Sequence, residues 1–257
     1  MEARKPDIVS GRVHPPNLLL LVVASAMEAR AILRAADATE PAPPRQQPPD
    51  DWRPFKLWPG CDLLCCGIGK TNAAAATAMA LTQHEYRAVM SIGVAGSLPG
   101  SGVALGDVIA ATACVYADEG LESPSGFLDC HTMGFALGPF DGSAVPADPA
   151  LLDLLKPFCD ATGPIATVST CSGTDARAVA VRARTRALAE AMEGAAVAHV
   201  AFRIAQLHSD RPLAIGELRV VSNTTGDRDA QAWDIKRSLS RLTEVVEQLR
   251  RTSLEFH

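Results

Sequence analysis

Short apolar runs alternate with helix-like segments along almost the whole chain, and this alternation limits the possible folds most strongly. Residues 18–24, LLLLVVA, form a wholly apolar run of the kind found in buried parallel strands. Residues 27–36 follow with apolar side chains at helical spacing, and residues 61–66 and 71–84 repeat the same order. The repetition predicts an α/β protein with three layers, α/β/α, around a mixed, largely parallel, twisted central sheet. Ligands of such sheets bind beyond the carboxyl ends of the strands.

The rest of the chain fits the same plan and is expected to form a single domain over residues 18–251. Further strands are expected at residues 88–92, 107–117, 166–170 and 212–223, and helices at 175–185, from about 194, and at 233–251. The glycines of GVAGS are expected to end the strand at 88–92 in a turn.

Three segments lie outside this plan. Residues 1–17 are rich in charge and proline and are predicted to form a flexible N-terminal arm. Residues 38–54 are crowded with prolines, which no helix or central strand tolerates, and are predicted to be a surface insertion. Residues 252–257 are read as a short tail.

Composition excludes several classes of protein. The net charge of −5 and the absence of a run of Lys or Arg argue against nucleic-acid binding. The longest apolar run is too short to cross a bilayer and no secretory segment is recognisable, so we expect a cytoplasmic protein without a membrane partner. Seven cysteines without a C-x-x-C pair indicate reduced, buried thiols and no zinc site. We expect neither a metal nor a cofactor.

The stretch CCGIGKTN, residues 65–72, is similar to a phosphate-binding loop but lacks its essential parts. A P-loop requires a glycine five residues before Gly69, where this chain has Leu64. The dinucleotide pattern also fails, because Asn72 stands where its third glycine is needed. The two glycines are therefore expected to serve a tight turn from strand to helix, with Lys70 as a solvated residue of the first helical turn.

The segment EAMEGAAVAHVA, residues 190–201, is the most informative part of the sequence. Glu193 lies between a short expected strand and a helix rich in small residues, so its side chain should project into a crevice. A carboxylate there can accept two hydrogen bonds from a vicinal diol such as that of ribose. A glutamate in this place also often caps the helix or pairs with an arginine, and the segment alone does not decide between these roles.

Five motifs together resemble the purine nucleoside phosphorylase and nucleosidase superfamily over about residues 18 to 250: AMEAR, GIGKTNAAAA, SIGVAGSL, the Met-Glu-Gly turn and RVVSN. The segments YADEGLESPSGFLDCHTMGF and RVVSNTTGDRDAQAWDI are most similar to the futalosine hydrolase family. That resemblance implies a homo-oligomer that uses water to release hypoxanthine from the nucleoside futalosine, in a route to menaquinone.

The resemblance also implies which residues bind substrate. Met192 and Glu193 would hold the ribose, while Val94, Ala95 and Gly96 would bring backbone groups close to the ribose and the base edge. Asn223 would meet the leaving base, and Ser222 before it would also bind substrate. The set implied by the resemblance for substrate binding is Val94, Ala95, Gly96, Met192, Glu193 and Ser222.

Asn223 replaces the aspartate that adenine-cleaving nucleosidases of the superfamily carry. Its amide offers both a donor and an acceptor, so it can donate to N7 and accept from the edge of a 6-oxopurine. An amide cannot deliver a proton, but hypoxanthine can leave as an anion stabilised at N7. Asn223 therefore points to inosine-like substrates, although an Asn at a strand end also commonly forms a local turn.

Glu28 is our candidate for the catalytic group that positions water. A gapless alignment of LLLVVASAMEARAIL with the nucleosidase pattern places Glu28 on the catalytic glutamate, whereas an alignment on Ala-Met places Arg30 there and removes the base. A glutamate in the first turn of a helix also simply favours the helix dipole. The Gly-Asp-Pro-x-Arg loop with which related phosphorylases hold phosphate is absent, which favours hydrolysis, and Arg30 alone keeps phosphorolysis open.

Three alternatives to a futalosine hydrolase stay open at this point: a methylthioadenosine or S-adenosylhomocysteine nucleosidase, an inosine-type phosphorylase, and a nucleoside-binding protein without catalysis. Phe127 and Phe135 are expected to cover the ribose tail, to meet another subunit or to pack in the core. GDRD, residues 226–229, is read as a carboxylate–guanidinium tether or a solvated loop.

Overall fold

The structure, a computed structural model, describes residues 19–37, 52–208 and 212–252. The predicted N-terminal arm, most of the proline-rich insertion and the tail beyond Thr252 lie outside these residues. The elements in chain order are β1 (Leu19–Val23), α1 (Ala26–Asp37), β2 (Phe55–Trp58), β3 (Cys61–Cys65), α2 (Lys70–Gln83), β4 (Ala88–Ser97), β5 (Val108–Tyr116), β6 (Gly120–Ser123), β7 (Gly126–Asp129), β8 (Ala144–Pro146), α3 (Pro149–Leu155), η1 (Lys156–Phe158), β9 (Ala161–Thr167), α4 (Asp175–Thr185), β10 (Ala189–Ala191), α5 (Gly194–Leu207), β11 (Ala214–Thr224), η2 (Arg228–Ala230) and α6 (Ile235–Arg251).

Within the described residues, nine strands form one mixed sheet in the order β10-β9-β5-β11-β4-β1-β3-β2, with β8 beside β5. Strands β3, β1, β4 and β11 run parallel to one another, as the alternation of strands and helices predicts. Strand β5 runs antiparallel to β11, and β10 pairs with β4 as well as with β9. This extra pairing closes β4, β11, β5, β9 and β10 into a ring.

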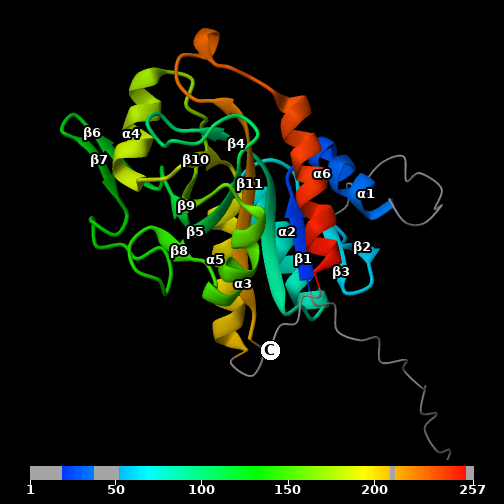
Figure 1. The fold of residues 1–257 in the computed structure, drawn as a ribbon. Helices are drawn as coiled ribbons and strands as arrows, with labels where there is room; N and C mark the ends of the chain where they lie inside the picture. The colour runs from blue at the N-terminus through cyan, green and yellow to red at the C-terminus, as the bar shows by residue number, and fades with distance from the viewer. Residues whose placement is uncertain (1–18, 38–51, 209–211, 253–257) are drawn as a thin grey trace, which may run out of the picture.

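Helices cover both faces of the sheet and make the predicted three layers (Figure 1). Helices α2 and α5 pack against each other and on one face, over a core that includes Val89, Ala95 and Val221. Helices α1 and α6 lie side by side on the other face, over a core that includes Ile32 and Leu242. The fold class inferred from the sequence is therefore confirmed.

Two expectations about the strands differ from the structure. The strand predicted at 88–92 does not end in a glycine turn: it continues through Gly93 and Gly96 to Ser97. Both glycines are extended strand residues whose missing side chains leave room for neighbours. Secondly, the strand predicted at 166–170 lies at Ala161–Thr167 as β9 and ends three residues earlier. The short strand β10 runs antiparallel to β4, with Glu190 opposite Gly96. The residues that follow β10 therefore continue alongside β4 in the direction of Gly93. They lie inside the ring and not at the carboxyl ends of the strands.

The expectation that every cysteine is buried is only partly met. All seven lie in the described residues and are free thiols; Cys61, Cys65, Cys66 and Cys114 are buried, whereas Cys171 is exposed. Burial raises the pKa of the Cys66 thiol to about 12. In the part of the chain that the structure describes, no helix has the length and apolar content needed to cross a membrane.

Candidate active site

Glu28 lies in the first turn of α1 and forms a capping box with Ser25. The amide and the hydroxyl of Ser25 both donate to Oε2 of Glu28, at 2.9 and 2.8 Å, and the amide of Glu28 lies 3.3 Å from Oγ of Ser25. This reciprocal pair satisfies donors at the start of the helix, and the pattern Ser-x-x-Glu is its usual sequence signal. The helix-terminal role considered from the sequence is therefore present in the structure.

The other oxygen of the same carboxylate reaches into the sheet. The backbone N–H of Val94 donates to Oε1 of Glu28 at 2.9 Å, and the Glu28 side chain is buried. A side chain at Gly93 would overlap this oxygen and would also approach Nη1 of Arg219. Glu28 thus lies over the middle of β4 beside a buried guanidinium, whereas Arg30, the alternative from the other alignment, is exposed on α1.

Glu193 is held between the turn after β3 and the last strand. Its Oε1 accepts from the N–H of Gly69 at 3.0 Å, and its Oε2 lies 3.5 Å from Nη2 of Arg219. Gly67 and Gly69 have φ values of 90° and 94°, in the left-handed region that glycine favours, which explains why CCGIGKTN needs both. Burial, followed by the nearby Glu28 and Glu217 carboxylates, raises the pKa of Glu193, whereas Arg219 and Gly69 lower it.

Glu193 directly precedes α5, yet within the described residues its side chain makes no capping hydrogen bond. Of the two structural roles considered from the sequence, only the pairing with an arginine is found. Met192 is half-buried beside it and packs against a small apolar cluster formed by β9, α4 and their neighbours. The Met-Glu-Gly turn therefore enters the ring from the β10 side.

Arg219 joins the carboxylates, and the sequence analysis did not single it out. Its side chain is 1 % exposed; Nε donates to Oε1 of Glu217 at 2.8 Å, and Nη2 donates to Oγ of Ser91 at 2.7 Å. A signal was available: Glu217 and Arg219 stand two residues apart in an otherwise apolar strand, so they point to the same buried face. Charged residues are almost never fully buried unless paired, which marks such a pair as worth attention.

Ser222 and Asn223 close the other side of the site at the end of β11. The hydroxyl of Ser222 lies 3.2 Å from the carbonyl of Ala95 and 2.9 Å from Oδ1 of Asn223. Nδ2 of Asn223 donates to the carbonyl of Thr224 at 2.9 Å, and a side chain at Gly96 would come within 2.9 Å of the same nitrogen. The amide group of Asn223 is therefore held in a fixed orientation over Gly96.

A further buried carboxylate, Glu190, fixes the loop before α4. Its two oxygens accept from the N–H and the hydroxyl of Ser172, each at 2.6 Å. Since Glu190 and Asn223 both pair in register with Gly96, they stand on opposite sides of this glycine. Burial is the main cause that raises the pKa of Glu190, while the hydrogen bonds from Ser172 oppose it.

Several secondary expectations are changed by the structure. Lys70 is not solvated, because its ammonium pairs with Asp118 at 2.6 Å and with Glu119 at 2.7 Å, and its side chain is largely buried. In GDRD, Asp227 accepts from the N–H of Asp175, and Arg228 lies over the ring of Trp233, so the segment is no carboxylate–guanidinium tether.

The two phenylalanines considered from the sequence lie outside the core. The ring of Phe127 lies under Arg184, with 4.3 Å from the guanidinium carbon to the ring centroid, and Phe135 is 68 % exposed. Phe127 is on the hairpin formed by β6 and β7, and Phe135 lies in the turn that follows it. Core packing, one of the three roles left open for this pair, is thereby excluded for Phe135.

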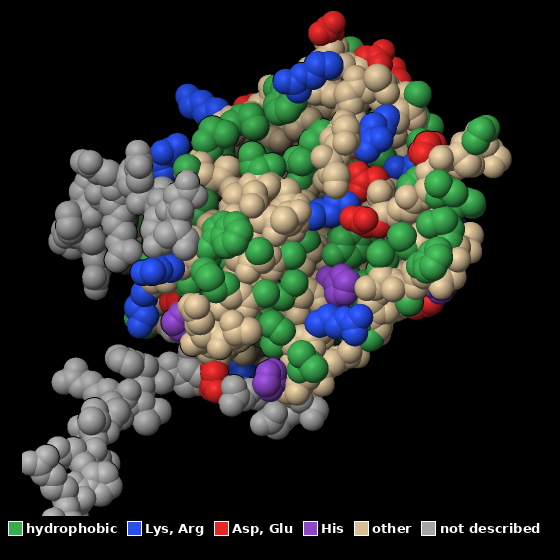
Figure 2. Space-filling view, turned by 180° about the vertical axis from the view of Figure 1, so that it is seen from behind, with side chains coloured by type: hydrophobic (Ala, Val, Ile, Leu, Met, Phe, Trp, Pro, Cys, Tyr) green, Lys and Arg blue, Asp and Glu red, His purple; other side chains and the backbone are tan. Residues whose placement is uncertain are grey.

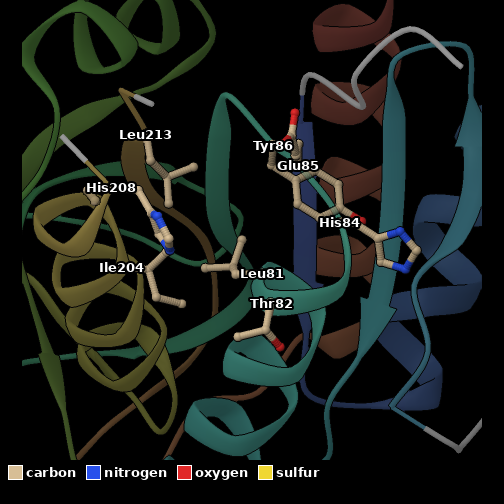
Figure 3. Close-up of a pocket in the computed structure, with 9 residues that line it drawn as sticks. Leu81, Thr82, His84, Glu85, Tyr86, Ile204, His208 and Leu213 are labelled. Carbon is tan, nitrogen blue, oxygen red and sulfur yellow. The ribbon is translucent and has the colours of Figure 1, made fainter. Parts of the chain in front are cut away.

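A separate cavity of about 210 Å³ lies near the amino ends of strands β4 and β11, away from the candidate site (Figure 3). It is lined by the end of α2, the end of α5 and the residue before β11, including Leu81, Ile204 and Leu213. In Figure 3, His208 faces the cavity, whereas His84 lies beyond Tyr86. None of the residues discussed above lines it.

The described residues, 19–37, 52–208 and 212–252, contain no group of three or more His, Cys, Asp or Glu that could hold a metal ion. The three glutamates of the site gather around Arg219 instead. The geometry thus brings together the eight residues implied by the resemblance: Glu28, Val94, Ala95, Gly96, Met192, Glu193, Ser222 and Asn223. A ligand with a diol and a polar, planar end matches the carboxylates at one side of this arrangement and the fixed amide at the other.

Comparisons with known proteins agree with this arrangement. The family model described as "Phosphorylase superfamily" matches residues 61–255. The chain is 36% identical over 241 residues to a futalosine hydrolase of Streptomyces coelicolor, covering 90% of this chain and 94% of the relative. It is 37% identical over 230 residues to a futalosine hydrolase of Acidothermus cellulolyticus, covering 87% and 86%.

The fold is also found among solved structures. A 5'-methylthioadenosine/S-adenosylhomocysteine nucleosidase of Neisseria meningitidis, in complex with methylthio-immucillin-A, superposes with a TM-score of 0.68 over 91% of this chain and 99% of that chain, at 20% identity. At this identity the likeness concerns the fold alone. The sequence relatives are the more specific finding, and they place this protein in the phosphorylase superfamily and, within it, in the futalosine hydrolase family.

Proposed function

We propose that this protein is an N-glycosyl hydrolase that cleaves futalosine to hypoxanthine and the base-free sugar product. The observation that carries this proposal is the match of about nine-tenths of the chain to curated futalosine hydrolases at 36% and 37% identity. The methylthioadenosine nucleosidase reading is less favoured, because it is supported by fold likeness alone and because Asn223 stands in place of aspartate. The resemblance further suggests a place in menaquinone biosynthesis in the cytoplasm.

The site supports a hydrolytic mechanism in which each group has one task. Water adds to the anomeric carbon of the ribose as the bond to N9 of the purine breaks, through a state with oxocarbenium character, and the proton of this water would pass to the carboxylate of Glu28. Glu28 would orient this water through Oε1, which accepts one hydrogen bond from Val94 and retains capacity for another. Glu193, with Oε2 facing Arg219, would accept hydrogen bonds from the ribose hydroxyls.

The leaving base would be stabilised by Asn223. One hydrogen of its amide nitrogen is committed to the carbonyl of Thr224, and the second is available to N7 of the purine. Ser222 fixes the orientation of the amide by donating to Oδ1. Because an amide is not an acid, the base departs as an anion held by this hydrogen bond and takes its proton from solvent.

Water is a better partner for this site than phosphate. Three buried carboxylates, Glu28, Glu193 and Glu217, surround one buried guanidinium, Arg219, so the site has an excess of negative charge that repels a phosphate dianion. Arg219 is already committed to Glu217 and Ser91, and Arg30 is exposed on α1. This distribution of charge favours hydrolysis over phosphorolysis.

A homodimer or larger homo-oligomer is part of the proposal. The hairpin of β6 and β7 places Leu121 directly opposite Leu128, and both are exposed, as is Phe135 in the turn that follows. In Figure 2, apolar side chains gather along the right-hand rim, on the side where the hairpin lies when the view of Figure 1 is turned. Exposed apolar patches of this kind mark protein–protein contacts. Light scattering should therefore give at least twice the mass of one chain, and a monomer would contradict this part.

One assay tests the activity. The protein is incubated with futalosine, inosine and methylthioadenosine, each with and without phosphate, and the free base and the sugar product are identified. Hypoxanthine released from futalosine regardless of phosphate supports the proposal. Strict dependence on phosphate indicates a phosphorylase, turnover of methylthioadenosine alone indicates the adenine-specific nucleosidase, and binding without any turnover indicates a protein that has lost catalysis.

A further inference from the structure

Glu217 is a buried charge to which the proposed mechanism gives no contact with the substrate. It lies in the middle of β11 with an exposed fraction of 0 %, in register with Ser91 of β4. On this strand, Ile215 and Val221 point to the same face and belong to the apolar core under α5. Glu217 and Arg219 therefore interrupt an otherwise apolar layer between the sheet and that helix.

The carboxylate of Glu217 is poorly satisfied as a structural group. Oε1 accepts from Nε of Arg219 at 2.8 Å, whereas Oε2 is buried and no nitrogen or oxygen donor among the described residues reaches it. The thiol of Cys114 on β5 faces the carboxylate, and burial together with this carboxylate raises the pKa of that thiol, but a thiol is only a weak donor. Apolar residues in place of both Glu217 and Arg219 would avoid that desolvation, and replacing a whole buried ion pair in this way is often neutral or stabilising. Stability of the fold therefore gives no account of why a carboxylate occupies this place.

Contacts of Glu217 point instead toward the site. A side chain at Gly194, the first residue of α5, would overlap the Glu217 carboxylate, so this group lies directly against the backbone that follows Glu193. The hydrogen bond from Nε of Arg219 to Glu217 leaves both terminal nitrogens of the guanidinium for other partners. Nη2 reaches Ser91 at 2.7 Å and Glu193 at 3.5 Å, and Nη1 faces the space beside Gly93 that Glu28 also borders.

We propose that Glu217 is a positioning residue for catalysis: by holding Nε of Arg219 and packing against Gly194, it directs the guanidinium toward Glu193 and Glu28. A planar guanidinium gripped at Nε and Nη2 cannot rotate, so its remaining edge keeps a fixed direction. Glu217 also balances part of the charge that Arg219 exerts on the two other glutamates. The inference rests on the proposed function, since futalosine cleavage is the reaction measured. The position of Arg219 can be tested without that reaction.

The test compares Glu217→Leu with Glu217→Gln. Leucine fills the space but cannot accept from Arg219, and a misplaced group near the reacting atoms should lower kcat by about 100-fold with little change in KM. Glutamine keeps the acceptor at Oε1 and should hold kcat within about fivefold of the unchanged protein. Glutamine also removes a negative charge that raises the pKa of Glu193, so the acid limb of the kcat/KM profile should move to lower pH.

Leu218→Ala is the matched control, since Leu218 is fully buried on the same strand but belongs to the core on the other face. It should lower the melting temperature while leaving kcat per folded molecule and the pH profile unchanged. Glu217 would be merely structural if both of its variants behaved like Leu218→Ala, or if Glu217→Leu kept the kcat of the unchanged protein. If the acid limb of the Glu217→Gln profile did not move, the inferred electrostatic effect of Glu217 on Glu193 would be overturned.

Crystal structures of the two variants supply a readout that does not depend on turnover. In Glu217→Leu the bond from Nη2 of Arg219 to Ser91 should be broken, whereas in Glu217→Gln it should be kept; an unmoved Arg219 in Glu217→Leu contradicts the inference. If the unchanged protein cleaves another nucleoside but not futalosine, the proposed function fails, and the same kinetic comparison is made on the nucleoside that it cleaves. If no nucleoside is cleaved, the position of Arg219 in the crystal structures of the two variants alone tests the inference.

Discussion

At the scale of single residues, Glu28 shows that one carboxylate can serve the fold and the site together. Oε2 completes the capping box with Ser25, while Oε1 faces Val94 and the buried guanidinium. The two roles considered for Glu28 from the sequence are therefore compatible, because the two oxygens point to different partners. Substitutions at this position must be chosen so that the capping role is kept.

Glu28→Gln should abolish release of base, by about 1,000-fold or more in kcat, while binding of futalosine is retained. Glutamine can still close a capping box with Ser25, so the helix start is preserved. Single-turnover kinetics and calorimetric titration with futalosine measure the two properties separately. Glu244→Gln, an exposed position on α6, is the control. Undiminished turnover would remove Glu28 from the mechanism.

Asn223→Asp should change the preference for the base. An ionised aspartate accepts from Ser222 as the amide does, but it offers no donor to N7 of hypoxanthine. We expect kcat/KM for futalosine to fall by about 100-fold, in line with the loss of one hydrogen bond in the transition state, while cleavage of methylthioadenosine rises relative to it. Competition between the two nucleosides in one reaction gives this ratio directly, and an unchanged ratio would contradict the role of Asn223.

At the scale of elements, β4 carries the site because its glycines leave space in the middle of the sheet. Gly93 has no room for a side chain, since Glu28 and Arg219 occupy that space. Gly93→Ala should therefore displace one of the two groups and lower kcat by about 100-fold. Gly216→Ala is the control in the neighbouring strand β11, where the new methyl group meets the flexible end of Leu151 and touches Met90 at an ordinary contact distance. Equal kinetics of the two variants would contradict this account.

The sequence predicted the elements well because their signals are local. Apolar runs and helical spacing placed most of the predicted strands and helices, and helix α4 lies where it was expected, at Asp175–Thr185. The glycines of GVAGS misplaced the end of β4, because they serve the strand and not a turn. What the sequence could not supply was the ring, since the pairing of β10 with β4 joins residues about ninety positions apart and depends on how far the sheet curls. The same non-local packing explains why Lys70 was expected in solvent: its partners, Asp118 and Glu119, come from a distant loop.

The candidate site was predictable in part for the same reason. Glu193 and Asn223 stand in motifs that can be read along the chain, but Arg219 acquires its meaning only when Glu193, Glu217 and Ser91 surround it. A buried strand with two charges on one face was the one local sign of this cluster. Such signs identify a buried charge without identifying its partners.

At the scale of the whole molecule, buried carboxylates make stability depend on pH. The folded state raises the pKa of Glu190, so its contribution to stability is present below the ordinary glutamate pKa and is lost as pH rises through the raised value. Glu190→Gln, which is neutral throughout, should therefore raise the melting temperature near pH 8 by about 2 °C, the shift expected for under 1 kcal/mol in a domain of this size. Near pH 4 the gain should vanish.

Calorimetric scans across this pH range measure the effect, with Glu244→Gln as an exposed control. If Glu190→Gln raised the melting temperature most at acid pH, the pH dependence would have the wrong sign. Burial would then not be the cause of the raised pKa of Glu190. The two bonds from Ser172 oppose the shift, so Ser172→Ala should make the unchanged Glu190 still more destabilising at neutral pH.

The packing of α6 on α1 has a consequence for how the protein is made. The hydroxyl of Thr243 donates to the carbonyl of Ala31 at 3.0 Å, and Nη1 of Arg250 donates to the carbonyl of Ala36 at 2.7 Å, so the last helix secures the helix that carries Glu28. Arg219 and Asn223 are also late residues, on β11. During synthesis on the ribosome Glu28 is made long before these partners, so we expect a translation product that is interrupted before β11 to cleave no nucleoside.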